Sequence, residues 1–267
     1  MINIFTLLSL LSFITCIMLA IHIYFKKVRH VFGNQLGKTF MYLCLSLALC
    51  WASLEFGYRL ADEYETAYLL LKLNVAWYFV ISLLLHFTLI FTEKKELLRR
   101  KKTYFLIYGP ALLLFLIDLH TDLLFTVPIK EQWGFMYGMP AHPIIYNISL
   151  TWAVITGFYC LYLLLEYYQK TSHLLKKKQT IHVLAGLLLP VATGFNTEYF
   201  LPMIGVRVPE LFVPTFTIGL IIWWYSIWIY APAKNKTRYK TVIPEIDNFL
   251  KGTKLEEQKL QQDKITT

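Results

Sequence analysis

Two charged residues, Glu55 and Lys72, lie inside otherwise apolar stretches of the sequence. An unpaired charge in an apolar medium is costly, so such residues are usually paired or functional. If consecutive stretches form neighbouring helices, Glu55 and Lys72 reach a similar depth and can pair. Arg59, four residues after Glu55, could join this pair or compete for the carboxylate. The pair would then form either the polar floor of a ligand pocket or a clasp between two helices.

A second set of polar and aromatic residues lies near the ends of later apolar stretches. Aromatic walls with a few polar groups are typical of small-molecule sites, although aromatic residues at this depth also anchor helices at a membrane interface. With the first pair included, the residues expected to bind a ligand are Glu55, Lys72, Trp77, His120, Trp133, Asn147, Asn196 and Glu198.

The sequence contains no familiar motif for catalysis or cofactor binding. It has no GxxxxGK[ST] phosphate loop, no HExxH metal motif and no GxSxG nucleophile motif. The four cysteines lie in apolar segments, and none has a partner at metal-ligand spacing. The stretch 211–230 contains no lysine, which excludes a retinal Schiff base there. We therefore expect no catalytic residue, no metal, no cofactor and no nucleic-acid partner.

The elements that must position these residues are long apolar helices. Of the 267 residues, 57% are hydrophobic and 16% are charged, which is too apolar for an ordinary soluble domain. A helix needs about 20 apolar residues to cross a bilayer. Stretches of this kind run at about residues 2–25, 40–58, 67–91, 104–119, 145–168, 180–200 and 211–230. We predict an all-α membrane protein, with a seven-transmembrane helix bundle over residues 1–231 and a basic juxtamembrane segment and short tail over residues 232–267.

Lysine and arginine residues indicate how the bundle is oriented. The segments 26–38, 93–103 and 169–180 contain four, six and four of them, and the tail contains eight. The segments on the other side contain one each. Because basic segments are retained on the cytoplasmic side, we predict an external N-terminus and a cytoplasmic C-terminus in a multi-pass protein of the cell membrane. Glycines, prolines and aromatic residues in the segment 119–144 predict an ordered cap with a short hairpin on the outer side.

Several stretches resemble a known family. LLKLNVAWYFVISLLLHFTLIFT, followed by a basic loop, is similar to the third span of the N-terminal seven-helix sensor region of bacterial and archaeal histidine kinases. NTEYFLPMIGVRVPELFVPTFTIGLIIWWYSIWIYA looks like the outer end of that family's sixth span, its loop and its seventh span. LIDLHTDLLF is similar to the segment after the fourth span. The resemblance covers about residues 1–240 and implies a signal sensor that drives a cytoplasmic catalytic module.

The sequence departs from the kinase pattern after Tyr230, where 37 residues follow and none is a histidine. We therefore expect a sensor without catalysis, which binds an extracellular or lipid-borne signal and relays a change to a cytoplasmic kinase or regulator. A small-molecule or lipid ligand and a homodimer are compatible with this role. The alternative is a small transporter or channel, whose pathway Glu55, Lys72, Asn147 and Asn196 could line.

Overall fold

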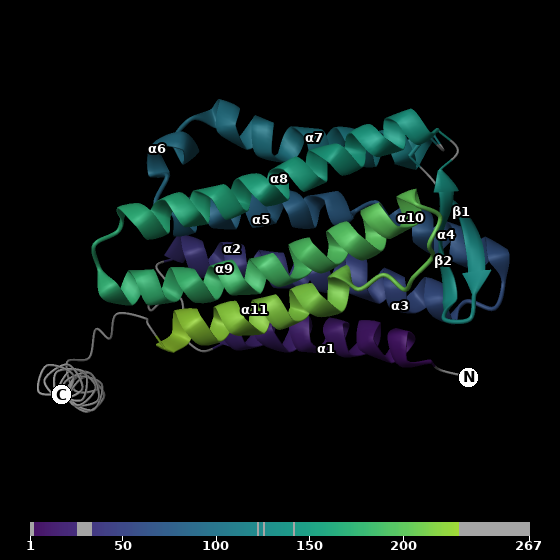
Figure 1. The fold of residues 1–267 in the computed structure, drawn as a ribbon, viewed down its shortest axis with the longest axis horizontal. Coiled ribbons are helices and arrows are strands. Elements are labelled where there is room, and N and C mark those ends of the chain that lie inside the picture. Colours follow the sequence, from purple (N-terminus) through teal and green to yellow (C-terminus); the bar gives the residue numbers. More distant parts are fainter. Residues whose placement is uncertain (1–2, 26–33, 122, 125, 141, 230–267) are drawn as a thin grey trace, which may run out of the picture. The chain divides into compact units, whose positions relative to one another are not determined.

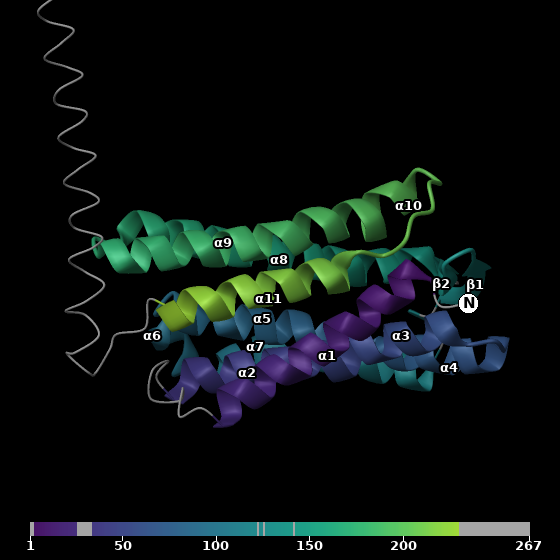
Figure 2. The same cartoon turned by 90° about the horizontal axis from the view of Figure 1, so that it is seen from below.

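The computed structural model describes residues 3–25, 34–121, 123–124, 126–140 and 142–229 of the chain. The predicted juxtamembrane segment and tail, residues 232–267, lie outside these ranges. The described residues form a bundle of helices that lie side by side along one direction, with a single β-hairpin at one end (Figures 1 and 2).

The bundle is built from seven apolar helical segments, three of which contain more than one helical element. The helices are α1 (Ile4–Phe25), α2 (Asn34–Leu47), α3 (Ser53–Leu60), α4 (Tyr64–Asn74), α5 (Trp77–Phe91), α6 (Lys95–Leu98), α7 (Lys101–His120), α8 (Pro143–Lys170), α9 (Leu174–Gly194), α10 (Leu201–Met203) and α11 (Phe212–Ile229). Two π-helical turns, η2 (Ala48–Ala52) and η3 (Phe195–Phe200), continue α2 into α3 and α9 into α10.

Six of these segments are long and apolar enough to cross a membrane, and the apolar α11 is shorter. The predicted all-α bundle is therefore confirmed. Several predicted boundaries fell short, as at α9, which begins at Leu174 rather than near residue 180. Lysine is a good helix former, and its long side chain can extend from a helix end toward water, so the lysines at 176–178 continue the helix.

The hairpin predicted between residues 119 and 144 is present as β1 (Thr126–Glu131) and β2 (Gly134–Pro140), which pair antiparallel. Its turn packs against the last turn of α3. Gly134 has a φ of 107°, and a Cβ at this position would lie 2.4 Å from the backbone oxygen of Arg59. Only glycine fits such a position, because both the dihedral angle and the close approach exclude a side chain. We call this end of the bundle the hairpin end.

The opposite end of the bundle carries α6 and the first turns of α9, and we call it the α6 end (Figure 1). Ion pairs join its segments: Lys94 contacts Glu166 on α8 at 2.8 Å, and Lys176 on α9 contacts Glu93. The hydrogen bond from Lys176 lowers the pKa of Glu93 below its ordinary value of 4.5. These contacts fasten the short connection between α5 and α7 to α8 and α9.

The centre of the bundle is aromatic and closely packed. Phe87 on α5 stacks on Trp223 on α11, with ring centroids 5.0 Å apart. The indole nitrogen of Trp223 donates a hydrogen bond to the backbone oxygen of Val183 on α9 at 2.8 Å. The backbones of α9 and α11 meet at Gly186 and Gly219, where a Cβ on Gly219 would lie 2.1 Å from the oxygen of Gly186. These contacts make α9 and α11 a tightly packed pair at the core of the fold.

Candidate functional site

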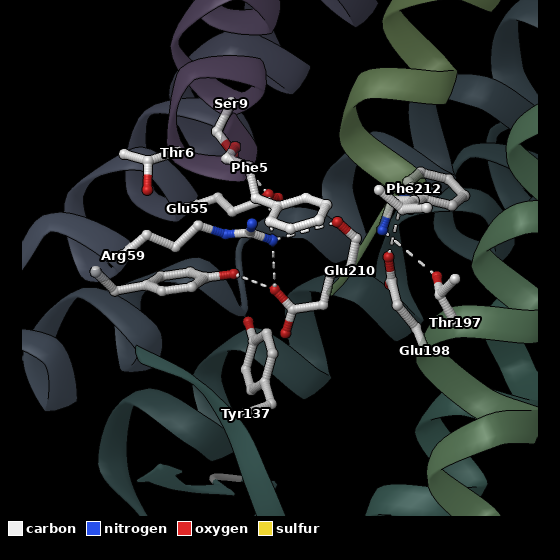
Figure 3. A network of polar contacts seen from close by, with 12 residues as sticks. Phe5, Thr6, Ser9, Glu55, Arg59, Tyr137, Thr197, Glu198, Glu210 and Phe212 are labelled. Atoms are coloured by element: carbon white, nitrogen blue, oxygen red, sulfur yellow. Dashed lines mark hydrogen bonds and ion pairs between the residues drawn. The ribbon is translucent and has the colours of Figure 1, made fainter. Parts of the chain in front are cut away.

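A buried ion-paired group lies at the hairpin end, centred on Arg59 (Figure 3). Its guanidinium lies 2.9 Å from Oε1 of Glu55, one turn earlier in α3, and 3.2 Å from Oε2 of Glu210. The side chains of Arg59, Glu55 and Glu210 are 1%, 2% and 8% exposed. A single guanidinium nitrogen, Nη2 of Arg59, thus contacts two carboxylates that are almost completely withdrawn from solvent.

Hydroxyl groups extend this group to other elements. Ser9 of α1 donates a hydrogen bond to Glu55 at 2.7 Å, and Tyr58 donates one to Glu210 at 2.8 Å. Arg59 also donates to the backbone oxygen of Glu210 at 3.2 Å. Ser9, Glu55, Tyr58, Arg59 and Glu210 together form what we call the charge network. It connects α1 and α3 to the segment that directly precedes α11.

The prediction that Glu55 pairs with Lys72 is wrong, because Glu55 pairs with Arg59. Arg59 follows Glu55 at the i+4 spacing of one helix, so the pair forms without any particular packing of α3 against α4. Lys72 lies on α4, with its ammonium 5.9 Å from the ring centroid of Tyr68. Arg59, the competing partner of Glu55 considered from the sequence, is therefore its partner in the structure.

The hairpin contributes Tyr137 to the edge of the charge network (Figure 3). Its ring meets that of Tyr58 edge to face at 6.1 Å, and its hydroxyl accepts a hydrogen bond from Asn74 of α4 at 2.6 Å. Burial raises the pKa of the Tyr137 hydroxyl well above its ordinary value of 10, and the charge of Glu210 raises it further. Tyr137 therefore remains a neutral phenol beside the buried carboxylate.

A cleft lies between α5, α8, η3 and the first turn of α11, with a volume of about 620 Å³ including its open mouth. Its lining residues are Trp51, Trp77, Ile81, Leu84, Leu150, Ala153, Val154, Gly157, Phe158, Val191, Gly194, Phe195, Glu198, Tyr199 and Phe212. Glu198 is the only charged residue in this described lining. A concave apolar site with one polar group is the usual form of a small-molecule site.

Aromatic rings form the inner wall of the cleft. Trp51 stacks on Phe212 with ring centroids 4.6 Å apart and an interplanar angle of 14°. The ring of Trp77 lies 5.2 Å from that of Trp51. Trp51 belongs to η2, and η3 supplies Glu198 and Tyr199 to the lining. Both π-helical turns therefore face the cleft, and such turns are rare features that often occur at functional sites.

Glu198 also holds the start of α11. Its Oε1 accepts a hydrogen bond from the backbone N–H of Phe212 at 3.1 Å, and Thr197 accepts one from the N–H of Leu211 at 3.4 Å (Figure 3). The first N–H groups of a helix have no partner within the helix, and its positive dipole end attracts a carboxylate. Two neighbouring residues of η3 therefore cap α11 from the side of the cleft.

The eight residues predicted to bind a ligand do not form one site. Trp77 and Glu198 line the cleft, whereas Glu55 belongs to the charge network and Lys72 lies on α4. Trp133, in the hairpin turn, packs edge to face on Phe5 at 6.4 Å. The remaining three, His120, Asn147 and Asn196, are exposed. The amide of Asn196 donates to the backbone oxygen of Ala192 in its own helical segment at 2.7 Å.

Sequence reasoning missed the role of Glu210 and the contribution of Trp51 and Phe212 to the cleft. One signal was available for Glu210, which is the only acidic residue in the segment 201–211 and directly precedes a long apolar run. An acidic residue at that place is typical of a helix start. No signal in the sequence connects Trp51 to Phe212, because their contact depends on how distant helices pack.

Comparison with known families agrees with this architecture. Residues 8–231 match the family model of the N-terminal 7TM region of histidine kinase. No curated protein sequence matches the chain. The match includes every helix that carries the charge network and the cleft, and the apolar helices show a multi-pass membrane protein. The chain thus belongs to the N-terminal seven-transmembrane region of histidine kinases, a sensor region and not a catalytic domain.

Proposed function

We propose that this bundle senses a small molecule that occupies the cleft, and that it relays occupancy to a cytoplasmic kinase or regulator through α11. One observation carries the proposal: Glu198 lines the cleft and also hydrogen-bonds the first residue of α11. A ligand that contacts Glu198 or Phe212 therefore acts directly on the start of the last helix. The family match supports the sensing role, because this region of the family is a sensor.

The start of α11 is held from two sides. Glu198 binds the N–H of Phe212 from the cleft, and Arg59 binds the side chain and backbone oxygen of Glu210 from α3. A ligand that displaces Phe212 must also strain the contact between Arg59 and Glu210, because Glu210 lies only two residues earlier. The bundle can then occupy two arrangements whose populations depend on the ligand, provided that the ligand binds them with different affinities.

Helix α11 is suited to carry such a displacement along its length. Its backbone contacts α9 at Gly219, and Trp223 donates a hydrogen bond to Val183, so α11 is packed closely against α9. Packed helices shift by sliding or rotating by small amounts rather than by bending freely. A movement at Phe212 is therefore expected to reach the far end of α11, next to the residues predicted to be cytoplasmic.

The test fills the cleft with a side chain that imitates a ligand. Gly157 lies on its wall, and a Cβ there meets only Val191, at an ordinary contact distance of 3.6 Å. The Gly157→Leu variant therefore extends into the cleft. Spin labels at Tyr42 on α2 and Tyr225 on α11, both exposed, report the position of α11 by pulsed electron resonance in nanodiscs. Cys50, which is less buried than the other cysteines, is replaced by alanine in every sample.

The matched control is Gly109→Leu in α7, because this glycine also has its nearest contact at 3.6 Å but does not line the cleft. We expect the distance distribution between the labels to change in Gly157→Leu and to stay unchanged in Gly109→Leu. Identical distributions in the original chain and in both variants would contradict the proposal, because filling the cleft would then have no effect on α11.

A further inference from the structure

We propose that the cleft binds a cationic amphiphile, a molecule with an apolar body and a single ammonium group that reaches the site from the bilayer. This inference rests on the proposed function in that it names the class of signal. It is carried by the chemistry of the lining: one carboxylate, no basic residue among the described lining residues, and a wall of aromatic rings.

The cleft opens on the outside of the bundle between helices, and not through a loop region. Its lining residues Phe158 on α8 and Phe195 on η3 are 52% and 36% exposed. They belong to segments that are long and apolar enough to span a membrane, and their neighbours Ile155 and Leu188 are exposed as well. Exposed apolar side chains on membrane-spanning helices face lipid. A ligand that is soluble in the bilayer can therefore enter sideways between α8 and η3.

The charge of the site selects against anions. Helix starts are good anion sites because of their unpaired N–H groups, but Glu198 already occupies the N–H of Phe212. An anionic ligand would have to displace this carboxyl group and would find no basic residue among the described lining residues. The second oxygen of Glu198 takes no hydrogen bond from the described residues, so it can face a cation in the cleft. An ammonium group, whether or not it carries a hydrogen, supplies a charge of the opposite sign.

The aromatic wall favours a cation for a separate reason. The faces of aromatic rings carry negative charge density and attract ammonium groups, most strongly where water is excluded. Six aromatic residues line the cleft together with Glu198: Trp51, Trp77, Phe158, Phe195, Tyr199 and Phe212. Within this set, the rings of Phe195 and Tyr199 lie 5.5 Å apart on the same turn of helix as Glu198.

Pairing also removes a cost that each partner bears alone. A carboxylate facing the bilayer interior is unfavourable, and so is an ammonium group that leaves the headgroup region. When the two meet in the cleft, each neutralises the other, and the apolar body of the ligand covers the apolar side chains of the lining. A neutral molecule of the same shape gains the apolar contact but not the charge pairing.

The experiment uses the full chain in nanodiscs of an uncharged glycolipid, with three probes that share one bromo-octyl body. The probes are bromo-octyltrimethylammonium, bromo-octanol and bromo-octanoate. Bromine quenches tryptophan fluorescence on contact, and Trp51 and Trp77 line the cleft. The same titration is made with Gly157→Leu, whose cleft is filled by the leucine side chain. The difference in quenching between the original chain and this variant measures binding in the cleft rather than partition of the probe into the bilayer.

We expect saturable quenching by the ammonium probe and none by the octanoate. The Glu198→Gln variant, which keeps an acceptor for Phe212, should weaken the ammonium probe about thirtyfold and leave bromo-octanol unchanged within about twofold. The matched control is Glu65→Gln, the same change on an exposed residue of α4 that does not line the cleft, and it should alter neither probe. A melting curve of each variant shows that it remains folded.

Equal affinity for the ammonium probe and bromo-octanol, or equal affinity of the original chain and Glu198→Gln for the ammonium probe, would overturn the inference. Repeating the titration in phosphatidylcholine nanodiscs distinguishes the sources of the ammonium group. If phosphatidylcholine competes with the ammonium probe for the cleft, the natural ligand is a lipid headgroup. If it does not compete, the natural ligand is a free amphiphile. In both cases the group bound in the cleft is a cation.

The outcome is separable from that of the proposed function. If the ammonium probe binds in a Glu198-dependent manner but the distance between the labels at Tyr42 and Tyr225 does not change, the ligand class stands and the relay fails. If Gly157→Leu moves α11 but the ammonium probe does not bind, the relay stands and the ligand class is wrong.

Discussion

Replacing Arg59 by methionine removes the cation that holds two buried carboxylates together. The guanidinium makes ionic contacts with Glu55 at 2.9 Å and Glu210 at 3.2 Å, and it donates to the backbone oxygen of Glu210 at 3.2 Å. Methionine retains much of the length and apolar volume of the arginine stem. The variant therefore changes the charge balance of the network far more than its packing.

The expected loss of stability follows from the burial of the three side chains, of which the most exposed, Glu210, is 8% accessible. Removing one partner of a buried ion pair costs about 3–5 kcal/mol, because the remaining charge is left without compensation. For a region of this size, each kcal/mol lowers the melting temperature by about 2–4 °C. We therefore expect Arg59→Met to melt about 6–20 °C below the original chain.

The assay is thermal unfolding of the full chain in nanodiscs, followed by intrinsic fluorescence. Arg207→Met is the matched control: Arg207 also contacts one carboxylate, that of Glu131 at 3.0 Å, but the two side chains are 49% and 26% exposed. Ion pairs of this kind contribute at most about 1 kcal/mol. A triple variant with Arg59→Met, Glu55→Gln and Glu210→Gln removes all three charges and should recover most of the loss.

Two results would refute this reasoning. The first is a loss in Arg59→Met no larger than in Arg207→Met, which would show that the buried pairs are energetically equivalent to exposed ones. The second is a triple variant as unstable as Arg59→Met, which would show that the loss comes from packing and not from uncompensated charge.

Three further predictions concern other parts of the bundle. Gly219→Ala places a Cβ against the backbone oxygen of Gly186, so it should destabilise the fold by about 1–3 kcal/mol in unfolding measurements, whereas Gly109→Ala should be tolerated. Because Lys176 lowers the pKa of Glu93, this ion pair contributes its full stability above pH 4.5 and loses it as the pH falls through the lowered pKa; Glu93→Gln should flatten the loss of melting temperature in that interval by a small amount, since the pair is half exposed. A cytoplasmic reporter enzyme fused to Thr267 should be active, and a reporter that works only outside the cell should be silent there.

The helices could be predicted from the sequence because bilayer-spanning length and apolar composition are local properties. Seven stretches were expected, and each became a helical segment of the bundle. The hairpin was also expected, because glycine, proline and aromatic residues cluster between residues 119 and 144. The errors lie at helix ends such as Leu174, where charged residues continue a helix beyond the apolar run.

The site was predictable only in part, because its contacts join distant positions. Glu55 and Arg59 are four residues apart, and their pairing was one of two options open from the sequence. The contact between Arg59 and Glu210 joins residues 151 positions apart, so it requires α11 to return to α3. Likewise, Glu198 could be recognised as an unusual carboxylate near a membrane, but its bond to Phe212 depends on the turn between η3 and α11.

The charge network and the cleft both contact the short segment that enters α11. Glu210 is bound by Arg59 on one side, and Phe212, two residues later, is bound by Glu198 on the other. A segment bound at two residues so close together cannot move at Phe212 without straining the contact at Glu210, because a buried charge pair is costly to separate. A ligand that neutralises Glu198 weakens its hydrogen bond with Phe212, while the contact between Arg59 and Glu210 remains. The start of α11 would then pivot about Glu210, and the charge network would act as the fixed point of the relay rather than as part of the ligand site.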